Sequence, residues 1–227
     1  FKKKVITIHI QNPKINSKNF DYVIAPKHDN YENKNVLHTS GALHQFTQEM
    51  IDECSDKINI NCKNNLVSII IGGPNRHYDF SNKAVYDLIK KIKFFKKKFN
   101  NLNFVVIPSR RTKKVTLEIL INELGKIAYV WDKKTINPYL FALKHSKYFI
   151  LTSDSTSMIS ECAFTGKPVH IYHLPFKRVS TRIVNFHKEF EEKNITRKLD
   201  EKLEDWNYTP LNEAERIAGI IRPRIIQ

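Results

Sequence analysis

The chain of 227 residues contains little cysteine and little glycine, and it has no long uninterrupted apolar run. Without such a run no segment can span a bilayer, and the first residues do not have the order of a signal peptide. The cysteines are odd in number and lack metal-ligand spacing, which is typical of free thiols in a reducing compartment: Cys54, Cys62 and Cys162. No carboxylate pair has ligand spacing either. We therefore expect a cytoplasmic protein without a metal or a cofactor.

Acidic side chains are also scarce, since 38 Lys and Arg stand against 23 Asp and Glu, for a net charge of +15. Such an excess attracts nucleic acid or an anionic membrane. The charge is mostly lysine in a chain rich in Asn and Ile, as an AT-biased coding sequence would give. Its densest run, "KKIKFFKKKFNN", fits the exposed side and end of a helix, so we do not expect a nucleic-acid partner. Peripheral contact with the inner face of a membrane stays open, because Phe94, Phe95 and Phe99 interleave the lysines.

Neither a Walker sequence nor a GxGxxG fingerprint is present, so no single motif identifies a nucleotide site. The 41% of hydrophobic residues suffice for a core, and β-rich runs alternate with helical patterns, the signature of parallel βαβ units. We expect helices over 82–98, from about 115, from about 138 and over 155–165. The matching five-stranded parallel sheet, from about Leu66 to His173, has its strands in "LVSIIIGGP", "NFVVIPSRR", "IAYVWD", "KYFILTSDS" and "PVHIYHLP".

The first part of the chain is less regular. Its β-rich runs "KVITIHI", "DYVIAP" and "NVLHT" are separated by loops too short for full crossover helices, and a helix is expected near Ala42. A polar segment near residues 55–65 predicts a boundary between a partial N-terminal Rossmann-like domain, 1–60, and a C-terminal Rossmann-like domain, 61–227. The amphipathic tail "PLNEAERIAGIIRP" predicts a closing helix over 211–222. The fold class is therefore α/β.

Ligands of an open parallel sheet bind beyond the carboxyl ends of the strands, so the loops that follow the predicted strands are the candidate site. Paired glycines allow close backbone approach, and arginine can neutralise a diphosphate with forked donors. In isolation, the glycine pair is more often only a turn and the arginines are more often only surface charge. Four such loops at one edge favour a site formed by Gly72, Gly73, Ser109, Arg110, Arg111, Trp131, Asp132 and residues 153–157.

The last of these loops, in "LTSDSTSMISECAFTGKPV", is rich in side-chain oxygens and begins the predicted helix 155–165. Asp154 or Ser153 is the expected N-cap, and a helix start after a parallel strand offers amide donors and a positive dipole end to phosphate. Spacing puts Asp154, Ser157 and Glu161 on one face, from which Glu161 could accept from ribose hydroxyls. The alternative is that Ser and Thr merely cap and solvate an ordinary helix start.

Several stretches together resemble one known family: "HIQNP", "FDYVIAPKHDN", "VLHTSGALHQ", "IIIGGPNRHY", "SRRT", "LTSDSTSMISECAFTGKPV" and "WNYTPLNEA". They are similar to the family of the plant mitochondrial-fission "elongated mitochondria" protein and its bacterial relatives, over nearly the whole chain. The resemblance implies a two-domain GT-B architecture, like that of nucleotide-sugar glycosyltransferases. It also implies that this chain lacks the first part of the N-terminal domain.

In GT-B enzymes the C-terminal domain holds the donor nucleotide, with a helix start on the phosphates and a helix Glu on the ribose. The resemblance assigns these roles to Ser155, Thr156, Ser157 and Glu161. On the opposite domain, "PKHDN" offers His28 as general base, with Asp29 beside it. A lone histidine is more often structural, and the upstream segment could also carry the base.

Two functions follow from the resemblance. The first is a glycosyltransferase that binds a nucleoside-diphosphate sugar and transfers the sugar, with inversion, to an unknown acceptor, while Arg110 and Arg111 stabilise the departing diphosphate. The second is a non-catalytic adaptor that keeps the GT-B fold and binds a protein partner or a membrane, as the plant relative's recruitment of a dynamin-related protein implies.

Overall fold

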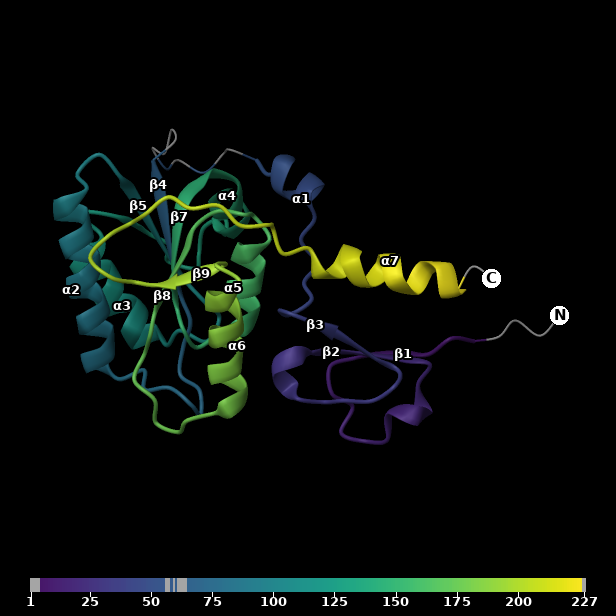
Figure 1. The fold of residues 1–227 in the computed structure, drawn as a ribbon. Coiled ribbons are helices and arrows are strands. Elements are labelled where there is room, and N and C mark those ends of the chain that lie inside the picture. The colour runs from purple at the N-terminus through teal and green to yellow at the C-terminus, as the bar shows by residue number, and fades with distance from the viewer. Residues whose placement is uncertain (1–4, 56–57, 59, 61–64, 226–227) are drawn as a thin grey trace.

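The computed structural model describes residues 5–55, 58, 60 and 65–225, which form a larger and a smaller unit (Figure 1). The larger unit is a parallel six-stranded sheet of order β6-β5-β4-β7-β8-β9. Its strands are β4 (Leu66–Ile71), β5 (Asn103–Pro108), β6 (Tyr129–Val130), β7 (Ser146–Thr152), β8 (Val169–Tyr172) and β9 (Thr196–Lys198). The five expected strands are thus confirmed, and β9 is a sixth at the edge of the sheet.

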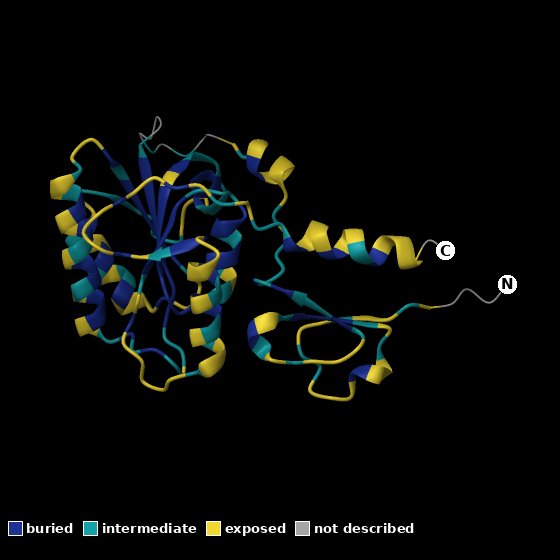
Figure 2. Cartoon of the chain, in the orientation of Figure 1, coloured by how far each residue is buried: buried dark blue, intermediate teal, exposed yellow. Residues whose placement is uncertain are grey.

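Helices cover both faces of this sheet, and each face has its own apolar core. On one face lie α2 (Asn82–Lys98) and α3 (Lys114–Leu124); on the other lie α4 (Tyr139–His145), α5 (Thr156–Ala163) and α6 (Thr181–Glu192). The central strand β4 is buried at all six positions (Figure 2), as a parallel strand covered on both sides must be. The helix α6 was not expected, although Phe186 and Phe190 recur at helical spacing and are fully buried.

The lysine-rich helix α2 matches its expected bounds and shows why this segment is helical. Ser81 caps it by accepting from the Ala84 amide, its apolar stripe lies in the core, and lysines end it at the negative end of the dipole. The expected row of aromatics is only partly exposed. Phe95 is 1% exposed and belongs to the core, whereas Phe94 is 43% exposed. Among the described residues no helix is long and apolar enough to span a bilayer.

The smaller unit is a parallel sheet of three strands, β1 (Ile8–Ile10), β2 (Tyr22–Pro26) and β3 (Val36–Thr39), in that order. Short 3₁₀ helices, η1 (Ser17–Asn19) and η2 (Lys27–Asp29), lie in its connections. The first strand is shorter than its apolar run, whose first residue lies outside the described residues. This sheet has only a small core of its own.

The chain crosses between the two units twice. After β3 it passes to the larger unit, where α1 (Gln48–Asp52) packs through Ile51 against the α4 side of the core. This short helix lies later than the one expected near Ala42. At the other end, α7 (Glu213–Ile225) returns and packs Ile217 and Ile221 on Ile24 of the small sheet (Figure 1).

Candidate functional site

The carboxyl ends of β4, β5 and β7 are joined by a buried polar network centred on Asp154. This carboxylate is fully buried and pairs with the Arg111 guanidinium at 2.7 Å. It also accepts from the Gly73 amide at 3.1 Å and from the Thr152 hydroxyl at 2.6 Å. Arg111 donates a second bond to the Gly73 carbonyl at 2.9 Å. The network therefore fixes the relative positions of the three loops.

Glycine is required at the centre of this network. A Cβ on Gly72 would lie 2.1 Å from both carboxylate oxygens of Asp154, so any side chain there would displace the ion pair. Neither Gly72 nor Gly73 lines a cavity described below, and we assign the pair to close packing of the loops.

The helix start at α5 differs from expectation in its cap. Ser155, not Asp154 or Ser153, is the N-cap, and its hydroxyl accepts from the Met158 amide. Asp154 is turned into the network instead of sharing a helix face with Ser157 and Glu161. Ser153 is also internal, because its hydroxyl accepts from the Leu174 amide at 3.0 Å. The solvent-facing part of the turn therefore begins at Ser155.

A cavity of about 770 Å³ opens at this edge of the larger sheet, and we call it the edge cavity. It brings together seven of the predicted residues, from the ends of β5, β6 and the α5 start: Ser109, Arg110, Arg111, Trp131, Ser155, Ser157 and Glu161. Sequence reasoning missed the others, among them Gln45 and Phe46, which come from the crossing segment after β3. Only the three-dimensional path of that segment reveals them.

Glu161 is prepositioned in the edge cavity by Tyr139, at the first position of α4, which sequence reasoning also missed. The Tyr139 hydroxyl donates to the Glu161 carboxylate at 2.5 Å. Burial raises the pKa of the Glu161 carboxyl, and the Tyr139 hydrogen bond and the charge of Arg110 offset part of that rise. The Glu161 carboxylate is thus held in one orientation, with a second oxygen to accept from a ligand.

The two adjacent arginines have different surroundings. Arg111 is committed to Asp154 and to the Gly73 carbonyl, whereas Arg110 is exposed and acts through its charge on Glu161. Arg111 thus already uses two of its N–H donors within the loop network, and we assign ligand binding in the edge cavity chiefly to Arg110.

Trp131 and Asp132 are also adjacent in sequence but differ in their surroundings. Trp131 lines the edge cavity. The Asp132 carboxylate instead closes its own turn by accepting from the amides of Lys134 and Thr135, at 2.9 and 3.2 Å, and these bonds lower its pKa. Asp132 lies outside both cavities described here.

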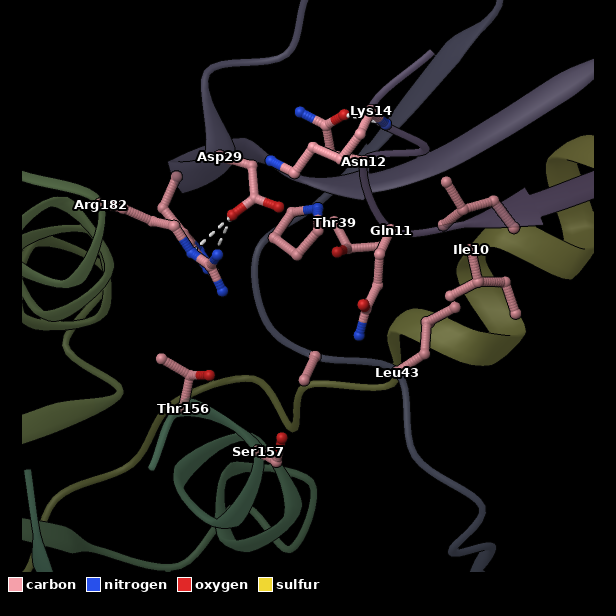
Figure 3. A pocket seen from close by; sticks show the side chains of 14 residues that line it. Ile10, Gln11, Asn12, Lys14, Asp29, Thr39, Leu43, Thr156, Ser157 and Arg182 are labelled. Carbon is pink, nitrogen blue, oxygen red and sulfur yellow. Dashed lines mark hydrogen bonds and ion pairs between the residues drawn. The ribbon is translucent and has the colours of Figure 1, made fainter. Parts of the chain in front are cut away.

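A second cavity, of about 230 Å³, lies between the two units, and we call it the inter-unit cavity (Figure 3). His28 and Asp29 from η2 line it on one side, and Thr156 and Ser157 from the α5 start line it on the other. Arg182 at the start of α6 also lines it, and its Nε lies 2.7 Å from Asp29 Oδ1. The predicted general base His28 with its neighbour Asp29 and the predicted phosphate-binding turn thus line one cavity although they are distant in sequence. Ser157 lines both cavities.

His28 is held as a neutral imidazole at the wall of the inter-unit cavity. Its side chain is 2% exposed, and its ring packs edge-on against Phe186. Burial lowers the pKa of His28, while Asp29, whose carboxylate lies 3.8 Å from the ring Nε2, acts in the opposite direction. A buried neutral histidine next to a carboxylate can accept a proton at neutral pH.

Comparison with known proteins decides the family. The model of the family described as mitochondrial fission ELM1 matches residues 1–225. The chain belongs to this family. The mitochondrial fission protein ELM1 of Arabidopsis thaliana is 25% identical over 97% of the chain and 58% of its own length. An uncharacterized protein of Rickettsia prowazekii, RP120, is 35% identical over 68% of the chain and 45% of its own length. The chain thus spans about half the length of these relatives.

Comparison with solved structures shows the fold of this ELM1-family chain. A putative UDP-N-acetylglucosamine 2-epimerase from Listeria monocytogenes is similar over 96% of the chain and 67% of its own, with 11% identity and a TM-score of 0.52. The UDP-GlcNAc 2-epimerase from Neisseria meningitidis bound to UDP-GlcNAc is similar over 93% and 64%, with 12% identity and a TM-score of 0.50. At this identity the likeness shows the fold alone, which is GT-B-like as expected.

Proposed function

We propose that this ELM1-family chain binds a nucleoside-diphosphate sugar in the edge cavity and transfers the sugar to an acceptor in the inter-unit cavity. The observation that carries the proposal is the position of Ser157, which lines both cavities at the start of α5. A diphosphate held at that helix start would have its nucleoside on one side and its sugar on the other. Helix amides and a positive dipole end suit a diphosphate there.

Three groups of the edge cavity match the parts of a nucleoside diphosphate. The exposed guanidinium of Arg110 can donate to the phosphates as they depart. The oriented carboxylate of Glu161 can accept from ribose hydroxyls. Trp131 and Phe46 offer aromatic surface to the base.

On the acceptor side, His28 is the proposed general base. An acceptor hydroxyl attacks the anomeric carbon, and its proton passes to the neutral imidazole of His28 while the new carbon–oxygen bond forms. The bond from that carbon to the diphosphate oxygen breaks, and its electron pair leaves with the nucleoside diphosphate. Asp29 stabilises the imidazolium that results.

Calorimetric titration with UDP tests the donor site, and UDP is the first probe because the similar Neisseria meningitidis enzyme is bound to UDP-GlcNAc. Arg110→Gln should weaken UDP binding, because it removes the charged donors. The matched control is Arg178→Gln, an exposed arginine of the loop before α6 that lines neither cavity. Equal UDP affinity in wild type and Arg110→Gln would reject the donor site.

A second candidate function, the adaptor, is favoured by the outer face of α2. Five residues at helical spacing lie on that face, all of them exposed: Lys83, Tyr86, Lys90, Phe94 and Lys97. Lysines that alternate with exposed aromatics fit an anionic membrane surface. Co-sedimentation with phosphatidylcholine vesicles containing phosphatidylserine tests this. Binding that is lost in the double variant Tyr86→Ser, Phe94→Ser would support docking, whereas unchanged sedimentation would reject it.

A further inference from the structure

The inter-unit cavity is positively charged in a way that the transfer reaction does not require. Lys14, from the loop after β1, and Arg182 both line it, against the single carboxylate of Asp29. Figure 3 shows Lys14, Asp29 and Arg182 at one end of the cavity and Thr156 and Ser157 at the other. An acceptor with only hydroxyl groups would leave this excess of charge unmatched.

Two helices also begin at this cavity. Thr156 and Ser157 belong to the first turn of α5, and Arg182 to the first turn of α6. The first amides of a helix have no partner within it, and they carry the positive end of the dipole. Both helix starts therefore add to the potential of the two cationic side chains.

Arg182 is positioned by an ion pair and still has N–H donors that a ligand can accept from. Asp29 fixes the guanidinium through Nε at 2.7 Å, and a guanidinium carries five N–H donors. The wall also contains the buried imidazole of His28.

The backbone around the cavity is held in an uncommon conformation. Gln11 and Lys14 line the cavity with φ of 78° and 61°, and Asn30, directly after Asp29, has φ of 49°. The left-handed region is costly for side chains such as Gln and Lys, and residues held there often belong to binding sites. Lys14 is held in this conformation, and it is the charged residue that the loop after β1 contributes to the cavity lining.

We propose that the inter-unit cavity binds a phosphate group carried by the acceptor, with Lys14 and Arg182 as its cationic ligands. This inference rests on the proposed function, because it takes this cavity as the acceptor site. A phosphate in the same region could also be that of the donor. The test must therefore separate a phosphate bound in the inter-unit cavity from the diphosphate of a nucleotide.

Inorganic phosphate is the probe, titrated into the whole chain by calorimetry, alone and with saturating UDP. Phosphate should bind in both cases, and Lys14→Gln or Arg182→Gln should weaken it by about tenfold, the loss of one charged hydrogen bond. UDP affinity should not change in these variants. The matched controls are Lys18→Gln, an exposed lysine of η1, and Arg178→Gln, and both should bind phosphate as wild type does.

Three results would overturn the inference. Saturating UDP could abolish phosphate binding, in which case the donor site is the only phosphate site. Lys14→Gln could leave phosphate affinity unchanged; this exposed residue can be replaced without disturbing the buried Asp29 carboxylate. The controls could weaken phosphate as much as Lys14→Gln does. If UDP itself does not bind, the proposed function fails, but a loss confined to Lys14→Gln and Arg182→Gln would still support the phosphate site.

Discussion

Replacing Arg111 and Arg110 separately by alanine should give opposite phenotypes, although the two residues are adjacent. Arg111→Ala leaves the fully buried Asp154 carboxylate without its counter-ion. Removing one partner of a buried pair costs about 3 to 5 kcal/mol, and the 40% exposure of the Arg111 side chain reduces this to about 2 to 3 kcal/mol. For a chain of this size we expect Tm to fall by about 4 to 12 °C. Differential scanning calorimetry measures it.

Arg110→Ala is the matched control for stability and the test variant for binding. Its side chain is exposed, so the free energy of unfolding should change by no more than about 0.5 kcal/mol. UDP binding should weaken by about tenfold to a hundredfold, because a charged hydrogen bond to the diphosphate is lost. A Tm for Arg110→Ala as low as that of Arg111→Ala, or a wild-type Tm for both, would contradict the division of roles derived from Asp154.

Three further predictions concern single side chains. His28→Gln should leave UDP affinity unchanged and slow sugar transfer by about a hundredfold or more. Equal factors of loss in UDP affinity and in the transfer rate would contradict the role of His28 as a base. Glu161→Gln should weaken the binding of uridine more than the binding of inorganic diphosphate. Burial raises the pKa of the Glu161 carboxyl, so the wild type should lose stability relative to this variant as the pH rises from 4 to 7. Burial lowers the pKa of His170 to about 4, so protonation below pH 6.5 favours the unfolded chain, and His170→Leu should lose less stability than wild type between pH 7 and 5 in urea denaturation.

The central sheet could be predicted because its signal is local. The strand Leu66–Ile71 is apolar except for Ser68, and α2 has a cap, a periodic stripe and a lysine-rich end. By contrast, β9 is three residues long and contains two charges, so nothing in its composition marks a strand. Its place at the sheet edge depends on pairing with β8, which is a tertiary contact.

The candidate site was predictable by loop but not by residue. The rule that ligands bind beyond the strand ends selected loops that do line one cavity, yet Asp154 and Arg111 form a structural pair that sequence cannot distinguish from ligand-binding groups. The ion pair of Asp29 with Arg182 joins residues more than 150 positions apart. Spacing along the chain holds no information about such contacts, and Tyr139 beside Glu161 is a further example.

The position of α7 has a consequence for the order in which the protein can fold during synthesis. The small sheet precedes the larger unit along these residues, but the helix that covers its Ile24 face follows the larger unit. Until α7 leaves the ribosome, Ile24 and Leu37 of a nascent chain face water or a chaperone, while the larger unit can already close its two cores. A translation product that stops before Glu213 will therefore carry an open apolar face of parallel strands, which is a surface for aggregation.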